Sequence, residues 1–160
     1  MIERKYIAEW QEFAPWNEFA QVEQDLIISR ALCAIFQDDW LSTQLAFRGG
    51  TALHKLYLNP APRYSEDIDL VQTVPGPVGP IMKRLKEVID FFEEPRKTSI
   101  GGHGAKAHYR FTSTYEQEPR RLKIEINCRE HFTVFGLQSV PLSVESNWYM
   151  QQCYPHIYAQ

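Results

Sequence analysis

The chain has 160 residues and a formal net charge of -3, and 44% of its residues are hydrophobic, 13% aromatic and 23% charged. This length suffices for one domain with a hydrophobic core and is too short for two, while the composition excludes an intrinsically disordered chain. The acidic balance excludes a broadly basic nucleic-acid binder but allows a local basic strip. We therefore expect one domain over residues 1–160, with an N-terminal extension at 1–21, a core at 22–149 and a tail at 150–160.

The sequence has no features of a membrane or secreted protein. No apolar run approaches the roughly 20 residues that a helix needs to cross a bilayer, and MIERKYIAEW is charged where a signal peptide is apolar. Cys33, Cys128 and Cys153 are odd in number and far apart in the sequence, which argues against a disulfide framework and a structural zinc site. We expect a cytoplasmic protein without membrane contact and with reduced thiols.

The first predicted element is a core helix over 22–36, where apolar residues recur at three- and four-residue steps. A short apolar stretch at 45–47 then runs into Arg48 and two glycines. Thr51 opens a second apolar-periodic segment, which the prolines of 59–62 end because proline cannot continue a helix. This order predicts a strand, a glycine turn and a helix.

Alternation of polar and apolar residues over 67–71 predicts a half-buried strand. The segment 74–80 is rich in proline and glycine and is expected to be an exposed connection. A second long helix is predicted from about residue 81, with Phe92 on its apolar face and Pro95 at its end.

The last predicted elements are two alternating segments at 107–115 and 122–127, which follow the glycine-rich 100–104 and flank a polar turn at 116–120. This spacing is typical of an antiparallel hairpin. The full order of helices and strands predicts an α+β fold in which helices pack on one face of a sheet.

Gly49, Gly50 and Thr51 form the first candidate functional feature. The unpaired N–H groups and the positive dipole end at the start of a helix favour a phosphate, and glycine lets the phosphate approach the backbone. A Gly-Gly pair before a threonine N-cap is also a common tight turn into a helix. The turn alone therefore leaves phosphate binding and a purely structural role open.

The second feature is Asp67 and Asp69, which are two residues apart on a predicted strand and therefore project to the same face. Two close carboxylates repel each other unless a cation lies between them, although a bare pair can also be a solvent-exposed acidic face. The chain order would bring this pair and the glycine turn to one end of the sheet. That arrangement suits a metal-bound triphosphate.

Glu125 is the third feature, on a predicted strand where it shares one face with Lys123 and Asn127. A third carboxylate can complete a two-metal site. Periodicity alone favours an ordinary strand that exposes its charged residues to water.

Three segments carry these features in a fixed order: FRGGTALHKLY at 47–57, RYSEDIDL at 63–70, and LKIEIN followed by CRE at 122–130. Together they resemble the AbiEii/AbiGii nucleotidyltransferase toxins of the DNA polymerase β-like nucleotidyltransferase superfamily, and the resemblance covers about 22–149. The family motifs are a GG[ST] turn, an acidic DxD after a short loop and a later carboxylate on a strand. The resemblance implies the polymerase β-like α+β fold, with a mixed sheet and helices on one face.

The resemblance also implies a role for each matching residue. The phosphate-holding turn would be Gly49, Gly50 and Thr51. The catalytic residues and ligands of Mg²⁺ or Mn²⁺ would be Asp67, Asp69 and Glu125. Further contacts near the nucleotide would be Arg63, which offsets the acidic cluster or contacts phosphate, and Ser65, which caps the turn.

The implied reaction transfers a nucleoside monophosphate from a nucleoside triphosphate to an acceptor hydroxyl and releases pyrophosphate, without a covalent enzyme intermediate. Family members are usually the toxin of a bacterial toxin–antitoxin or phage-defence pair, and some relatives modify the acceptor end of tRNA. The implied partners are therefore a nucleoside triphosphate, a cognate antitoxin and an acceptor that includes tRNA among its candidates.

Two other functions stay open: a catalytically idle domain that acts through protein contacts, and a phosphotransferase that uses the same pocket. The family ordinarily continues into a helical half, which leads us to expect a folded chain with weak nucleotide binding and little activity alone. We also expect the apolar tail to pack on a partner or to form a homodimer. Its residues are Trp148, Tyr149, Tyr154, Ile157 and Tyr158.

Several other polar residues receive a structural interpretation. Lys55 is expected to be a solvated or ion-paired surface residue, and the alternative is that it contacts phosphate. His103 lies in a glycine-rich loop that is expected to be a plain connection, with closure over a ligand as the alternative. A basic strip for a nucleic-acid acceptor is a further hypothesis, against ordinary exposed charges. Its residues would be Arg96, Lys97, Lys106, Arg110, Arg120, Arg121 and Lys123.

Overall fold

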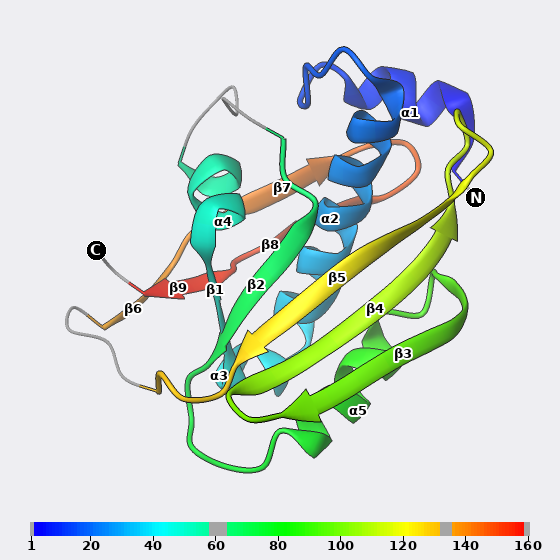
Figure 1. Cartoon of the computed structure of the whole chain (residues 1–160). Coiled ribbons are helices and arrows are strands. Elements are labelled where there is room, and N and C mark those ends of the chain that lie inside the picture. The colour runs from blue at the N-terminus through cyan, green and yellow to red at the C-terminus, as the bar shows by residue number, and fades with distance from the viewer. Residues whose placement is uncertain (1, 58–63, 132–135, 159–160) are drawn as a thin grey trace.

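The computed structural model describes residues 2–57, 64–131 and 136–158 (Figure 1). The helices are α1 (Arg4–Trp10), α2 (Phe19–Gln37), α3 (Leu41–Gln44), α4 (Gly49–Leu56) and α5 (Gly79–Val88). The strands are β1 (Leu45–Arg48), β2 (Asp67–Gln72), β3 (Glu93–Gly101), β4 (Gly104–Thr112), β5 (Pro119–Asn127), β6 (Leu137–Ser139), β7 (Leu142–Glu145), β8 (Met150–Cys153) and β9 (His156–Tyr158).

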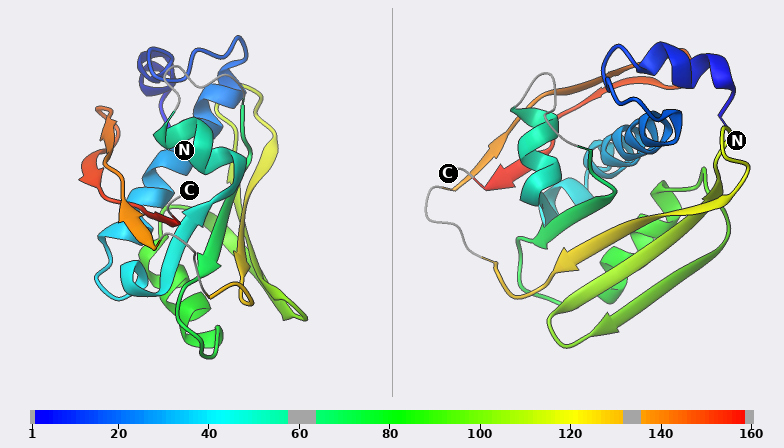
Figure 2. Two further views of the ribbon diagram at one scale, coloured as in Figure 1. Left: turned by 90° about the vertical axis from the view of Figure 1, so that its left-hand side faces the viewer. Right: turned by 45° about the horizontal axis from the view of Figure 1, so that its top comes forward.

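Seven of these strands form a mixed sheet in the order β3-β4-β5-β2-β1-β9-β6. Strand β2 runs parallel to β5 and β1 parallel to β9, while the other neighbours are antiparallel. Strands β7 and β8 form a separate antiparallel pair. Helices α2 and α5 cover one face of the large sheet (Figures 1 and 2). The predicted α+β fold with a mixed sheet is confirmed.

Helix α2 is the centre of the hydrophobic core because it is covered on two sides. It covers Phe19–Gln37, slightly more than the predicted range. One side faces the large sheet and the other contacts β7 and β8, as the right-hand view of Figure 2 shows. Val22, Leu26, Ile28 and Leu32 are therefore all buried, although they do not share one narrow stripe. None of the helices in the described ranges has both the length and the apolar character to cross a membrane.

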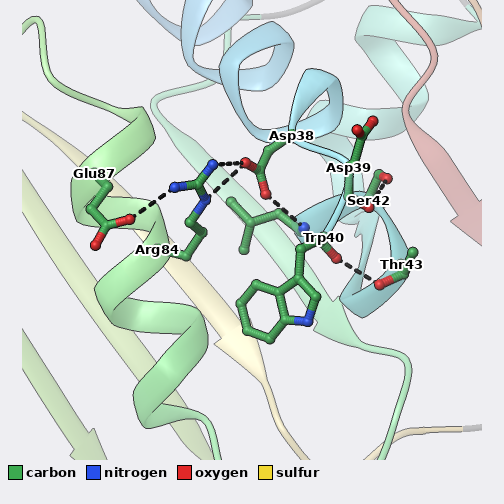
Figure 3. A network of polar contacts seen from close by, with 8 residues as sticks. Asp38, Asp39, Trp40, Ser42, Thr43, Arg84 and Glu87 are labelled. Atoms are coloured by element: carbon green, nitrogen blue, oxygen red, sulfur yellow. Dashed lines mark hydrogen bonds and ion pairs between the residues drawn. The ribbon is translucent and has the colours of Figure 1, made fainter.

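A cluster of ion pairs joins the end of α2 to α5 (Figure 3). Asp38, directly after α2, accepts a hydrogen bond from the backbone N–H of Leu41 at 2.9 Å and another from Nε of Arg84 at 2.8 Å. Arg84 also donates to Glu87 at 2.9 Å. Because α3 leads directly into β1, the hold of Asp38 on the start of α3 helps to fix where β1 begins.

The helix predicted to end at Pro95 is shorter than expected. Helix α5 ends at Val88, and Pro95 lies within β3. Strand β3 is an edge strand of the sheet, where proline is tolerated because one side of the strand needs no ladder hydrogen bond. Phe91 and Phe92 leave the helical path and stack with ring centroids 4.6 Å apart, so their apolar character reflects core packing rather than helical periodicity.

The predicted antiparallel hairpin is confirmed as β4 and β5, in which Tyr109 pairs with Leu122. Strand β4 begins at Gly104, earlier than predicted, because the glycine-rich segment is itself the turn between β3 and β4. Gly102 adopts a φ of 45° in this turn, a left-handed conformation that glycine tolerates. The result is a meander of three antiparallel strands at one side of the sheet.

The chain itself covers part of the apolar tail, while Tyr154 is 54% exposed. Ile157 of β9 is buried and pairs with Phe47 of β1, so the tail supplies a strand to the large sheet. The guanidinium of Arg30 lies 4.4 Å from the ring centroid of Trp148 and 4.9 Å from that of Tyr149. These contacts within the chain fix most of the tail, and a homodimer through the tail stays a prediction.

Two of the three cysteines meet although 120 positions separate them. The Sγ atoms of Cys33 on α2 and Cys153 on β8 lie 2.8 Å apart, and both thiols are free and buried. The hydrogen bond to Cys33 and burial raise the pKa of Cys153. This contact fastens the last part of the chain to the central helix.

Glu23 is a buried carboxylate that links α2 to the turn between β4 and β5. It accepts hydrogen bonds from the hydroxyl of Ser113 at 2.9 Å and from the backbone N–H of Thr114 at 3.0 Å. The side chain is only 1% exposed. Burial raises the pKa of Glu23, and these two hydrogen bonds partly offset that rise.

We predict that Glu23→Ala lowers the free energy of unfolding by about 2–4 kcal/mol, because two buried donors lose their acceptor. Urea denaturation measures the effect. The matched control is Glu12→Ala at an exposed position, which should change stability by less than about 0.5 kcal/mol. Equal stability of the two variants would show that the buried hydrogen bonds contribute nothing net.

A pH series on Glu23→Gln tests the raised pKa of Glu23. A carboxyl group with a raised folded pKa binds its proton more tightly in the folded state, so its contribution to stability falls as pH rises from the unfolded pKa through the folded one. The variant lacks this titration. Its unfolding free energy should therefore rise relative to the wild type across that window and stay constant above it. A constant difference at every pH contradicts the prediction.

Candidate functional site

The backbone conformation at the junction of β1 and α4 requires glycine at position 49. Strand β1 ends at Arg48 and α4 begins at Gly49, with no residue between them. Gly49 has a φ of 82°, and a Cβ added there would lie 2.9 Å from Oδ2 of Asp69. Both the left-handed φ and the contact with the carboxylate exclude an ordinary side chain. The start of α4 is therefore held directly against an acidic residue of β2.

Thr51 ties α4 to β2 rather than capping the helix. Its hydroxyl donates to the backbone carbonyl of Asp67 at 2.9 Å, and the residue is buried. Because the helix begins at Gly49, Thr51 lies in the first turn and not at the N-cap. The N-cap interpretation is thus wrong, and Thr51 fixes the distance between the glycine turn and the acidic strand.

The strand register brings the three predicted carboxylates to one face of the sheet. In the parallel pair of β2 and β5, Asp69 lies opposite Glu125 and Asp67 lies opposite Lys123. Asp69 also lies opposite Arg48 on the other side, in β1. Since residues two apart on a strand share a face, Asp67, Asp69 and Glu125 all project away from the covered face, where Ile68 and Ile124 are buried.

The charges around Asp69 are repulsive on balance. Burial raises the pKa of Asp69 most, and the negative charges of Glu125 and Asp67 raise it further, against smaller opposing effects of Lys123 and Arg48. A divalent cation would relieve this repulsion, and carboxylate oxygens are the ligands that Mg²⁺ and Mn²⁺ prefer. The donor set therefore fits such an ion.

Lysine side chains lie among the same carboxylates. Nζ of Lys123 is 3.3 Å from Oδ2 of Asp67 and 3.7 Å from Oε2 of Glu125, and Nζ of Lys106 is 3.8 Å from Oε1 of Glu125. Within the described part of the chain, no three acidic, histidine or cysteine side chains converge closely enough to hold a metal ion as they stand. Side chains of the three carboxylates would have to turn toward one another to share an ion.

Asp69 and Glu125 line a cleft of about 610 Å³, which we call the carboxylate cleft. Gly49 forms one wall, and the turn between β3 and β4 forms the opposite wall. His103 belongs to this turn, and its backbone carbonyl accepts the N–H of Cys128 at 3.1 Å, which anchors the turn to the end of β5. His103 thus lies in a short hairpin turn and lines the carboxylate cleft, and closure of this turn over a ligand stays a prediction.

A second cleft of about 720 Å³ lies on the other side of the glycine turn, and Arg48 and Gly49 line both clefts. We call it the aromatic cleft because Tyr57 and Tyr158 lie in its wall. Nη1 of Arg48 is 2.6 Å from Oε2 of Glu130, which also lines the aromatic cleft. The sequence analysis proposed no role for Arg48 or Glu130. The only sequence feature that points to them is their position within the FRGG and CRE segments.

Lys55 is ion-paired, as expected, and does not face either cleft. Its Nζ lies 2.9 Å from both carboxylate oxygens of Asp25 on α2, and Trp10 Nε1 donates to the same carboxylate at 2.8 Å. Ser65 is half-buried just before β2. Arg63 lies outside the described residues, so its predicted contact with phosphate stays a prediction.

Part of the hypothetical basic strip does share the open face of β4 and β5. Lys106, Arg110, Arg121 and Lys123 all occupy the positions that alternate with buried neighbours, next to Glu125. Burial lowers the pKa of His108 between them, and the nearby charges of Arg121, Lys123 and Lys106 lower it further. Arg120 instead pairs with Glu116 at 2.9 Å.

We predict that Gly49→Ala lowers the free energy of unfolding by at least about 1–2 kcal/mol, the cost of a left-handed conformation for alanine. The contact with Asp69 adds to this cost. Gly79→Ala is the matched control, since a Cβ at Gly79 meets no atom within 4 Å, and it should stay within about 0.5 kcal/mol of the wild type. Chemical denaturation of both variants decides the point, and equal stabilities would show that Gly49 is not constrained.

Comparison with known proteins places the fold and the family. The family model for the nucleotidyl transferase AbiEii toxin, type IV toxin–antitoxin system, matches residues 30–157. No curated protein matches the chain significantly. JHP933 from Helicobacter pylori is 19% identical with a TM-score of 0.56, and the match covers 75% of this chain and 49% of that one.

A second solved structure is MenT4, the nucleotidyltransferase toxin Rv2826c from Mycobacterium tuberculosis H37Rv. It is 18% identical with a TM-score of 0.64, and the match covers 100% of this chain and 56% of that one. The chain therefore spans about half the length of these proteins. The likeness establishes a shared fold, and the family model covers most of the chain. The chain belongs to the AbiEii family of nucleotidyltransferase toxins.

Proposed function

We propose that this chain carries the catalytic site of a metal-dependent nucleotidyltransferase toxin, which transfers a nucleoside monophosphate from a nucleoside triphosphate to an acceptor hydroxyl. One observation supports this most directly. Asp69 and Glu125 lie opposite each other in neighbouring strands, and a Cβ added to Gly49 at the start of α4 would lie 2.9 Å from Oδ2 of Asp69. A cation site and an anion site are thereby adjacent, which suits a metal-bound triphosphate.

Each proposed residue has a distinct task. The backbone N–H groups of Gly49 and Gly50 face the phosphates, and Thr51 holds α4 at the right distance from β2. Asp67 and Asp69 would hold the ion that carries the triphosphate, and Asp67, Asp69 and Glu125 would hold a second ion that activates the acceptor hydroxyl. When bound, Mg²⁺ or Mn²⁺ neutralises the triphosphate and lowers the pKa of the attacking hydroxyl.

In this reaction the acceptor oxygen bonds to the α-phosphorus as the bond to pyrophosphate breaks. Ser65 and Arg63 are proposed as further contacts near the nucleotide, on the segment that leads into β2. We extend the proposal to an RNA acceptor such as tRNA, because basic side chains flank Glu125 on the open face of β4 and β5. A cognate antitoxin, a role in phage defence and a cytoplasmic location are proposed from the family alone.

A catalytically idle domain is the second candidate, and the position of Lys123 favours it. Its ammonium group lies 3.3 Å from Asp67 and 3.7 Å from Glu125, where a metal ion would otherwise offset their charge. An idle domain would keep these ion pairs in the presence of nucleotide. An enzyme would exchange them for metal contacts, so the two candidates differ in metal dependence.

We predict that divalent-metal and nucleoside triphosphate binding are lost together in Asp69→Asn, while Glu125→Gln retains nucleotide binding and loses at least about 100-fold in transfer rate. The reason is that Asp69 holds the triphosphate-bearing ion and Glu125 acts on the acceptor. Calorimetry measures binding, and incorporation of labelled nucleotide into total RNA and protein measures transfer.

Glu145→Gln on exposed β7 is the matched control and should change neither quantity. Transfer is measured with this chain and with a longer relative of the family, because the chain spans about half the length of the solved relatives. Unchanged metal affinity in Asp69→Asn would support the idle domain. Transfer of only the terminal phosphate would identify a phosphotransferase instead.

A further inference from the structure

The aromatic cleft and the carboxylate cleft are joined at the glycine turn. Arg48 and Gly49 are lining residues of both, so the two clefts meet at the start of α4. A ligand that extends past Gly49 from the carboxylates therefore enters the aromatic cleft. This connection is a property of the strand order, because β1 lies between β2, which bears Asp69, and β9, which bears Tyr158.

The aromatic cleft has the composition of a site for a flat, partly apolar group. Phe47, Ala52 and Ile157 supply apolar surface beside the two tyrosine rings. Arg48, Glu130 and Gln138 supply its polar groups. Tyr57 is 51% exposed at the end of α4, which leaves much of its ring available to a ligand.

Both tyrosines are held in place by their hydroxyl groups. The amide Nε2 of Gln138 donates to the hydroxyl of Tyr57 at 2.6 Å. The hydroxyl of Tyr158 donates to the backbone carbonyl of Glu130 at 2.7 Å. Rings held in this way lose little conformational freedom when a ligand binds, so the cleft is arranged for binding before the ligand arrives.

The carboxylate cleft offers less aromatic surface, because His103 is the one aromatic ring among its described lining residues. Among the residues that line it in the described structure, the carboxylates, Lys106 and Arg48 are charged, and the turn between β3 and β4 is mostly glycine. Nucleobases bind proteins largely by stacking on aromatic side chains. Phosphates instead prefer the charged and glycine-lined surface. The two clefts therefore match the two chemically different halves of one nucleotide.

We infer that the aromatic cleft binds the base and ribose of the donor nucleotide, with Tyr57 as the principal stacking residue. The inference rests on the proposed function, since it places the triphosphate of that nucleotide over Gly49 and beside Asp69. The ion pair of Arg48 and Glu130 lies at the junction of the two halves. It holds Arg48, the residue after which α4 begins, in a fixed position beside the phosphates.

The test compares two ligands that share the phosphates and differ in the nucleoside. In the presence of Mg²⁺, calorimetry measures the affinity of the full chain for inorganic tripolyphosphate and for each of the four nucleoside triphosphates. We expect at least one nucleoside triphosphate to bind about tenfold or more tightly than tripolyphosphate. Tyr57→Ala should abolish that advantage and leave tripolyphosphate affinity unchanged.

Two variants serve as controls for this substitution. Tyr57→Phe keeps the ring and loses only the hydrogen bond to Gln138, so it should keep most of the advantage. Tyr154→Ala removes a tyrosine that is 54% exposed and lies outside both clefts, and it should have no effect.

The possible results separate the inference from the function on which it rests. If tripolyphosphate and nucleoside triphosphates bind but Tyr57→Ala changes neither, the base lies elsewhere and the inference is wrong while the proposed function stands. If Tyr57→Ala weakens both ligands equally, Tyr57 supports the turn and does not contact the base. If neither ligand binds at all, the proposed function and the inference fail together.

Discussion

The lack of space between Gly49 and the carboxylate of Asp69 constrains the whole site. A Cβ at Gly49 would lie 2.9 Å from Oδ2 of Asp69, so β1 can pass into α4 here only through glycine. The register of β1 on β2 sets this approach, because Arg48 lies opposite Asp69. The hydroxyl of Thr51 then fastens α4 to the carbonyl of Asp67. The passage of β1 into α4 beside β2 therefore positions both the candidate anion-binding turn and the candidate cation-binding carboxylates.

The closeness of the carboxylates to one another lowers the stability of the folded chain. Burial raises the pKa of Asp69, and the charges of Glu125 and Asp67 raise it further, so the folded chain holds like charges together without full compensation. Lys123 and Lys106 relieve part of the repulsion, because their ammonium groups lie within 4 Å of Asp67 or Glu125. A divalent ion would compete with these lysines for the same oxygens. The lysines therefore stabilise the metal-free chain and weaken metal binding, a compromise that is common at functional sites.

Periodicity within single segments predicted helix α2, the hairpin of β4 and β5 and the shared face of Asp67 and Asp69, and the order of these segments predicted the α+β fold. Sequence pattern failed to predict the elements whose structure depends on segments far away in the chain. Pro95 lies in a strand because β3 is at the sheet edge, and β9 joins the sheet because β1 has a free side for it. The ion pair of Arg48 and Glu130 joins residues 82 positions apart, which no periodicity reports.

The last strands of the chain show how far the site depends on such distant contacts. Trp148 and Tyr149 surround Arg30 of α2, and Cys153 contacts Cys33 on the same helix, so β8 is held against the core. Strand β9 follows within three residues and pairs with β1 directly before the glycine turn. Because Tyr158 of β9 forms part of the aromatic cleft, that cleft exists only when the end of the chain is docked. Loosening of β8 on α2 would therefore disturb the aromatic cleft before the carboxylates, which lie on strands that β9 does not touch.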